Sequence, residues 1–97
     1  MSTALTQLEA DMVYDILMEE CGASDRNRDE FLVYVTRDVR YGHEFRFMGH
    51  LGFGGKFYND GRRHWSVACY PEHRTPSVDD AILSANARLK DLANRED

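Results

Sequence analysis

Four histidines and two cysteines are the residues of this chain best suited to chemistry. Cys69 and His73 have a spacing that would serve for two ligands of a zinc site. The other candidate ligands are His50 and His64. Zinc sites are normally built from two close-spaced pairs, and the sequence contains no second pair. A small metal- or thiol-dependent enzyme would require these residues to converge in space, and no orienting or oxyanion-binding motif accompanies them. We therefore expect no catalytic residue, no metal and no cofactor.

The glycine-rich segment His50–Tyr58, with the sequence HLGFGGKFY, is the most distinctive stretch of the chain. A P-loop needs a hydroxyl residue directly after its Gly-Lys pair, and Phe57 stands there instead. A dinucleotide-binding loop started at Gly52 also meets Phe57, where its third glycine belongs. An RNA-recognition strand needs an aromatic residue at the central position that Gly55 occupies. We therefore interpret the segment as a strand whose glycines permit the close approach of a helix or a partner.

Two groups of charged residues are candidates for a protein interface. On the first predicted helix, Asp11, Asp15 and Glu19 follow one another at four-residue steps and form a row of carboxylates on one side. Such a row could take the place of duplex phosphates in a basic groove of a partner, although many such rows are simply solvated. The second group contains cationic and aromatic residues, which are typical of both interface hot spots and nucleic-acid contacts. Its members are Arg46, Lys56, Tyr58, Arg62 and Arg63.

The N-terminal third of the chain is predicted to be helical. Apolar residues near helical spacing indicate an amphipathic helix over residues 4–20, capped by Thr3 or Thr6 and ended by Gly22. Its predicted stripe contains Leu5, Leu8, Met12, Ile16 and Met18, widened by Val13 and Leu17. A second helix is predicted in SDRNRDEFLVYVTRD after an N-cap at Ser24 or Asp25. The run FLVYVT has the composition of a strand, so residues 29–36 remain open between helix and strand.

The remainder of the chain alternates like a sheet and then returns to a helix. In GHEFRFMG, Phe45 and Phe47 fall on one face together with His43, and LGFGGKFY follows as the second strand. NDG at residues 59–61 is typical of a hairpin turn, and RRHWSVACYP forms the third strand. The segment TPSVDDAILSANARLKDLANRED predicts a final helix with Thr75 or Ser77 as its cap. Its buried stripe is Val78, Ile82, Ala85, Leu89 and Leu92.

These elements predict one α+β domain over residues 1–97. Their order is α-α-β-β-β-α, with a three-stranded antiparallel meander and helices packed on one face. The alternative order is α-β-β-β-β-α, in which residues 29–36 form a strand. A chain of 97 residues with 42% hydrophobic content is long enough for one modest core.

Charge and composition exclude several classes of function. The net charge of −5 argues against indiscriminate binding to nucleic acid or to anionic membrane. The two ends are acidic and the middle is basic. No apolar run is long enough to span a membrane, and the N-terminus lacks the features of a secretory signal, so we expect a cytoplasmic protein. Cys21 and Cys69 lie far apart in the sequence, which favours free thiols in a reducing compartment.

The run EFRFMGHLGFGGKFYNDG, followed by HWSVACYPEHRTP and the closing helix, resembles small proteins carried by phages and prophages of GC-rich bacteria. The resemblance covers roughly the C-terminal half and brings no catalytic residues with it. It implies a compact, acidic, non-enzymatic inhibitor of host machinery, a class to which anti-CRISPR proteins belong.

We therefore expect a small protein-binding module, a phage-type inhibitor that docks on a host protein of the nucleic-acid machinery in the bacterial cytoplasm. The alternative is a nucleic-acid-binding module that uses the basic aromatic surface of the sheet. A homodimer is a further possibility if the outer face of the sheet is apolar and uncovered.

Overall fold

A computed structural model of the chain describes residues 5–35, 43–59 and 63–95. The described elements, in chain order, are the helix α1 (Gln7–Cys21), the 3₁₀-helix η1 (Asp25–Asn27), the helix α2 (Arg28–Val33), the strands β1 (His43–Met48), β2 (Gly54–Asn59) and β3 (Trp65–Cys69), the 3₁₀-helix η3 (Pro71–His73) and the helix α3 (Pro76–Ala93). The predicted order α-α-β-β-β-α is confirmed. The open segment is helical up to Val33, so the alternative with four strands is wrong for that part.

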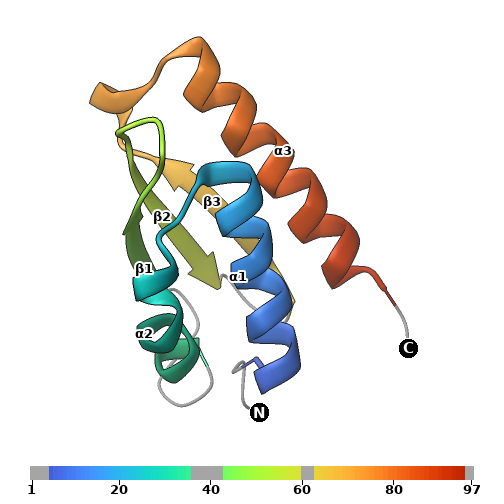
Figure 1. The fold of residues 1–97 in the computed structure, drawn as a ribbon. Coiled ribbons are helices and arrows are strands. Elements are labelled where there is room, and N and C mark those ends of the chain that lie inside the picture. The colour runs from blue at the N-terminus through green and yellow to red at the C-terminus, as the bar shows by residue number, and fades with distance from the viewer. Residues whose placement is uncertain (1–4, 36–42, 60–62, 96–97) are drawn as a thin grey trace.

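The three strands form an antiparallel sheet in the order β1-β2-β3, as predicted. Phe57 in the central strand lies opposite Phe45 on one side and opposite Val67 on the other. These residues therefore share one face, because paired positions in a sheet point to the same side. Figure 1 shows α1 and α3 side by side across that face, and the hydrophobic core lies between the two layers.

The predicted parity of the strands is confirmed on this inner face. Phe47, Phe57, Val67 and Trp65 are buried against the helices, while Cys69 at the end of β3 is half-buried. The turn predicted at Asn59–Gly61 falls largely outside the described residues. Its two flanking strands pair as a hairpin would, because Asn59 lies opposite Trp65.

The helix α1 begins and ends at residues that the sequence indicates. The Thr6 hydroxyl accepts a hydrogen bond from the Glu9 N–H, and the Glu9 carboxylate accepts one from the Thr6 N–H. This capping box satisfies two backbone donors that the first turn would otherwise leave unpaired. Gly22 ends the helix in the left-handed conformation, with φ of 70°, which glycine adopts without steric cost.

The buried side of α1 differs in part from the prediction. Leu8 was expected in the buried stripe, but its exposed fraction is 70%. Tyr14, which the predicted stripe omits, is fully buried and packs its ring 4.9 Å from the ring of Phe31 in α2. The helix is therefore rotated toward α2, and this rotation turns Leu8 to solvent. The fully buried residues of α1 are Ala10, Val13, Tyr14, Leu17 and Cys21.

The helix α3 follows its prediction more closely. The Thr75 hydroxyl caps it by accepting a hydrogen bond from the Val78 N–H, and Pro76 occupies the first turn. Its predicted stripe is buried, apart from Ile82, which is half-buried. None of the described helices is both long enough and apolar enough to cross a membrane.

The glycine-rich segment is a turn followed by a strand, and it does not form one continuous strand. Gly52 has φ of 80° and its N–H donates to the Gly49 carbonyl, so β2 begins only at Gly54. Leu51 lies in this turn and is 43% exposed. Of the close approaches that these glycines were expected to permit, the one at Gly54 is made within the chain. A Cβ added to Gly54 would lie 2.6 Å from the Tyr70 ring, so this aromatic side chain already fills the space.

Candidate interaction surfaces

The acidic row on α1 is engaged with arginines of the same chain. The Arg28 guanidinium lies 3.2 Å from an Asp11 oxygen and 2.6 Å from an Asp15 oxygen. The hydrogen bond with Asp15 is the largest of the contributions that raise the pKa of Arg28. Arg28 also sits over the Tyr14 ring, 5.3 Å from its centroid. These contacts tie α2 to α1 and neutralise much of the charge that the row carries.

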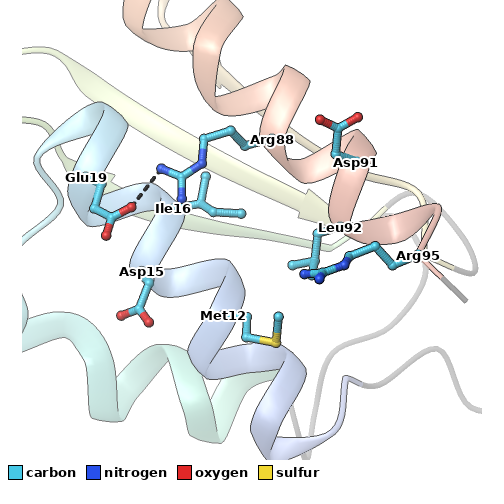
Figure 2. A pocket seen from close by; sticks show the side chains of 8 residues that line it. All are labelled: Met12, Asp15, Ile16, Glu19, Arg88, Asp91, Leu92 and Arg95. Carbon is cyan, nitrogen blue, oxygen red and sulfur yellow. Dashed lines mark ion pairs between the residues drawn. The ribbon is translucent and has the colours of Figure 1, made fainter. Parts of the chain in front are cut away.

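The third carboxylate of the row faces α3. Arg88 of α3 pairs with Glu19 at 2.7 Å and with Glu20 at 2.9 Å, and Figure 2 shows the Arg88 guanidinium reaching toward Glu19. The three predicted carboxylates therefore lie on one side of α1, as expected, but each has an arginine partner within the chain. A phosphate-mimicking row would have to break these pairs to engage a basic groove.

A shallow groove of about 450 Å³ runs between α1 and α3. Met12, Ile16 and Leu92 provide its apolar side chains, and charged residues of both helices line its margins (Figure 2). The charged residues are Asp15, Glu19, Arg88, Asp91 and Arg95. Arg88 and Glu19 are already paired here, so a partner that docks through the charged residues of this groove would compete with that pair.

Arg63 holds the helical layer together. Its Nε donates to the Ala93 carbonyl at 2.8 Å and one terminal nitrogen donates to the Leu92 carbonyl at 2.9 Å. Its other terminal nitrogen pairs with Glu9 at the start of α1. A guanidinium that satisfies the last carbonyls of a helix has a structural role. Arg62, the other arginine predicted at this hairpin, lies outside the described residues.

The side of the sheet that faces away from the helices forms a second surface, which we call the outer face. Because Lys56 lies opposite Arg46 and also opposite Ala68, these residues share this side. The pairing places Tyr58 between Glu44 and Ser66 in the next row. The outer face consists of Glu44, Arg46, Met48, Gly54, Lys56, Tyr58, Ser66, Ala68 and Tyr70. Figure 1 shows α1 and α3 on the opposite side of the sheet.

Cations and tyrosines are interleaved on the outer face. The Lys56 ammonium lies 4.9 Å from the centroid of the Tyr70 ring and 5.6 Å from that of Tyr58. Arg46 pairs with Glu44 of the same strand at 2.8 Å, and its side chain is 69% exposed. The hydrogen bond from Arg46 lowers the pKa of Glu44, and a hydrogen bond with Tyr58 raises the pKa of Lys56. Glu44, Arg46 and Lys56 are therefore all charged at neutral pH.

A shallow hollow of about 250 Å³ opens beside Arg46, Met48 and Tyr70. Met48 is 59% exposed, so its side chain adds apolar surface beside this hollow. Three of the predicted binding residues, Arg46, Lys56 and Tyr58, thus lie together on one surface. Sequence reasoning did not include Met48 and Tyr70 among the binding candidates. The alternation of β1 and β3 places them on the same side as Arg46 and could have identified them.

The candidate metal ligands lie at different places in the fold. His73 Nδ1 accepts a hydrogen bond from the Gly54 N–H at 2.8 Å, next to Tyr70. His50 lies on the β1–β2 turn, and its backbone N–H donates to the Cys21 carbonyl at the end of α1. Within residues 5–35, 43–59 and 63–95, no three His, Cys, Asp or Glu side chains are arranged to hold a metal ion.

The two cysteines are both free. Cys21 is fully buried in the core, and burial raises the pKa of its thiol to about 11. A thiol that stays protonated at neutral pH is a poor nucleophile. Cys21 therefore serves as a packing residue.

Comparison with protein-family models, curated proteins and solved structures gives no significant match to this chain.

Proposed function

We propose that this chain is a small, non-enzymatic protein-binding module that docks on its partner through the outer face of the sheet. The observation that carries this proposal is the composition of that face. It presents an exposed methionine, an exposed arginine and two tyrosines around a lysine, on the side opposite the helices. Arginine, methionine and tyrosine are the residue types enriched at the centres of protein interfaces.

The contacts within the chain also favour the outer face over the acidic row. Docking through Asp11 and Asp15 would compete with their pairing to Arg28, which also packs on Tyr14. Among the described residues, Arg46 by contrast pairs only with a neighbour on its own strand, and a partner carboxylate can join that pair without separating two elements.

Few cations remain available to bind nucleic acid, and this favours a protein partner. Of the four cations in the alternative hypothesis, Arg63 is bound to α3 carbonyls and to Glu9, and Arg62 lies outside the described residues. Arg46 and Lys56 share their surface with Glu44, and the chain carries a net charge of −5. Binding to a polyphosphate backbone depends on neutralising several phosphates at once.

The narrower form of the proposal is a phage-type inhibitor, similar in role to anti-CRISPR proteins, that docks on host nucleic-acid machinery in the bacterial cytoplasm. Its support is the resemblance of the C-terminal half to small phage proteins, together with the acidic composition of the chain. The outer face would then cover a functional surface of the host protein.

The test is affinity capture from a lysate of a GC-rich bacterium, with and without nuclease treatment. The sheet variant is Arg46→Glu/Lys56→Glu. Its matched control is Lys90→Glu/Arg95→Glu, which makes the same change of charge at exposed positions of the helical layer. We expect capture of a single protein, and nuclease treatment should not reduce its recovery. This protein should bind the purified wild type and the control, but not the sheet variant.

Two outcomes would contradict the proposal. Recovery of nucleic acid only, abolished by nuclease and weakened by salt, would favour the nucleic-acid-binding alternative. Recovery of a protein that binds the sheet variant normally but not the helical control would move the interface to the α1–α3 groove.

A further inference from the structure

The two edges of the sheet differ in how their backbone groups are satisfied. The Gly49 N–H bonds the Phe53 carbonyl, and the Tyr70 N–H bonds the Gly54 carbonyl. Hydrogen-bonded pairs alternate along an antiparallel ladder, so these two bonds fix which residues of each strand face outward. In β3, the outward position in the middle of the strand is Val67.

The edge at β3 is closed by α3. The Asn86 side chain of α3 accepts a hydrogen bond from the Val67 N–H at 2.7 Å and donates one to the Val67 carbonyl at 2.9 Å. The amide thereby occupies both backbone groups that another strand would use. Natural proteins commonly protect sheet edges by covering them in this way.

The edge at β1 has no such cover among the described residues. The same alternation directs the backbone groups of Glu44, Arg46 and Met48 away from β2. In the part of the chain that the structure describes, no backbone hydrogen bond reaches these groups. An edge strand with free N–H and C=O groups is a template for pairing with another strand.

We propose that β1 pairs antiparallel with β1 of a second copy of this chain, about a two-fold axis at Phe45, to form a continuous six-stranded sheet. In this register Glu44 of each copy lies opposite Arg46 of the other. Both residues have outward-facing backbone groups, so each pair can exchange two backbone hydrogen bonds. Opposite charges at directly paired positions stabilise a sheet.

The charge pattern selects this register over its neighbour. An axis at Arg46 also satisfies the alternation of hydrogen bonds, but it places Arg46 opposite itself. Like charges directly opposite one another destabilise a pair of strands. The self-complementary order of Glu44 and Arg46 therefore favours a second copy over an unrelated peptide strand. The proposed dimer would place two outer faces on one surface, although the pairing does not depend on what those faces bind.

Sedimentation velocity over a range of protein concentrations tests the pairing. We expect the wild type to form a concentration-dependent dimer. The single variants Glu44→Arg and Arg46→Glu should each be monomeric, because each places like charges opposite one another in the dimer. An equimolar mixture of the two should dimerise again, since every Glu and Arg then finds an opposite charge. Lys90→Glu, at an exposed position of α3, is the matched control and should dimerise like the wild type.

A wild type that remains monomeric at every concentration would overturn the inference. Dimers that persist in both single variants, or a mixture that does not recover dimerisation, would overturn the register. Circular dichroism of each variant verifies that the monomer is folded. The result is separate from the test of function, because sedimentation is measured on the purified chain alone, whereas affinity capture detects a different protein.

Discussion

The helical side and the outer face of the sheet both carry arginines, but the arginines have different roles. On the helical side, Arg28 joins α2 to α1, Arg63 joins the start of β3 to both α1 and α3, and Arg88 joins α3 to α1. On the outer face, Arg46 pairs with a residue two positions away in its own strand. Charges that connect separate elements support the fold, whereas charges paired within one element remain available to a partner.

The largest expected effect concerns the core beneath the helical side. Leu17→Ala removes a fully buried side chain of α1 and should lower the free energy of unfolding by about 2 to 5 kcal/mol. Leu8→Ala, on the same helix, removes a side chain that is 70% exposed and should change it by less than about 0.5 kcal/mol. Urea denaturation at one fixed protein concentration measures both. Equal losses would contradict the rotation of α1 described above.

Substitution of the adjacent residues Gly54 and Gly55 compares how tightly the two faces of β2 are packed. A Cβ at Gly55 would meet the buried Phe47 ring at 2.6 Å, and one at Gly54 would meet the half-buried Tyr70 ring at the same distance. Phe47 is confined by the core, whereas Tyr70 can move toward solvent. Gly55→Ala should therefore cost about 1 to 3 kcal/mol of stability, and Gly54→Ala less. A larger cost at Gly54, measured by urea denaturation, would mean that the outer face is packed as rigidly as the core.

Substitution of Arg63 and of Arg46 compares the stability contributed by an arginine that joins separate elements with that contributed by an arginine of the outer face. Arg63→Ala removes the hydrogen bonds to the last carbonyls of α3 and the pair with Glu9, and should lower the free energy of unfolding by about 1 kcal/mol. Arg46→Ala removes one exposed pair and should lower it by less than about 0.5 kcal/mol. Thermal unfolding followed by circular dichroism compares the two. If Arg46→Ala were the more destabilising, the outer face would be part of the folding framework.

The smallest expected effect is a dependence on pH at the start of α1. Burial acts to raise the pKa of Glu9, but the hydrogen bonds from Thr6 and the charge of Arg63 outweigh it and lower the pKa below its ordinary 4.5. The charged form is therefore favoured in the folded state, so its stabilisation is present above pH 4.5 and is lost as the pH falls through the lowered value. Unfolding measured between pH 6 and 3 should show a shallower decline in Glu9→Gln than in the wild type. An identical decline in the two proteins would contradict this contribution.

Much of the fold follows from local patterns in the sequence. The caps at Thr6 and Thr75 and the alternation of β1 and β3 depend on residues a few positions apart, and the structure confirms them. The position of Leu8 was predicted wrongly because α1 carries two overlapping apolar stripes. Which stripe is buried depends on where α2 packs, and that is not encoded within α1 itself.

The contacts that distinguish the two surfaces could not be predicted in the same way. Arg28 and Asp11 are 17 residues apart, and Arg63 and Glu9 are 54 residues apart, so no local pattern relates them. Sequence spacing therefore indicated the carboxylate row correctly but could not show that arginines occupy it. The grouping of Arg46, Lys56 and Tyr58 was within reach, because strand alternation and pairing are sufficient to place them on one face.

The most direct test of the proposed interface is an NMR titration of the ¹⁵N-labelled protein with its purified partner. We expect the shifted backbone amides to cluster in residues 44–48, 54–58 and 66–70, the strand segments that carry the outer face. Amides of α1 and α3 around Asp15, Glu19 and Arg88 should be unaffected. Shifts that cluster in these helices, with the sheet unchanged, would contradict the assignment of the outer face as the binding surface.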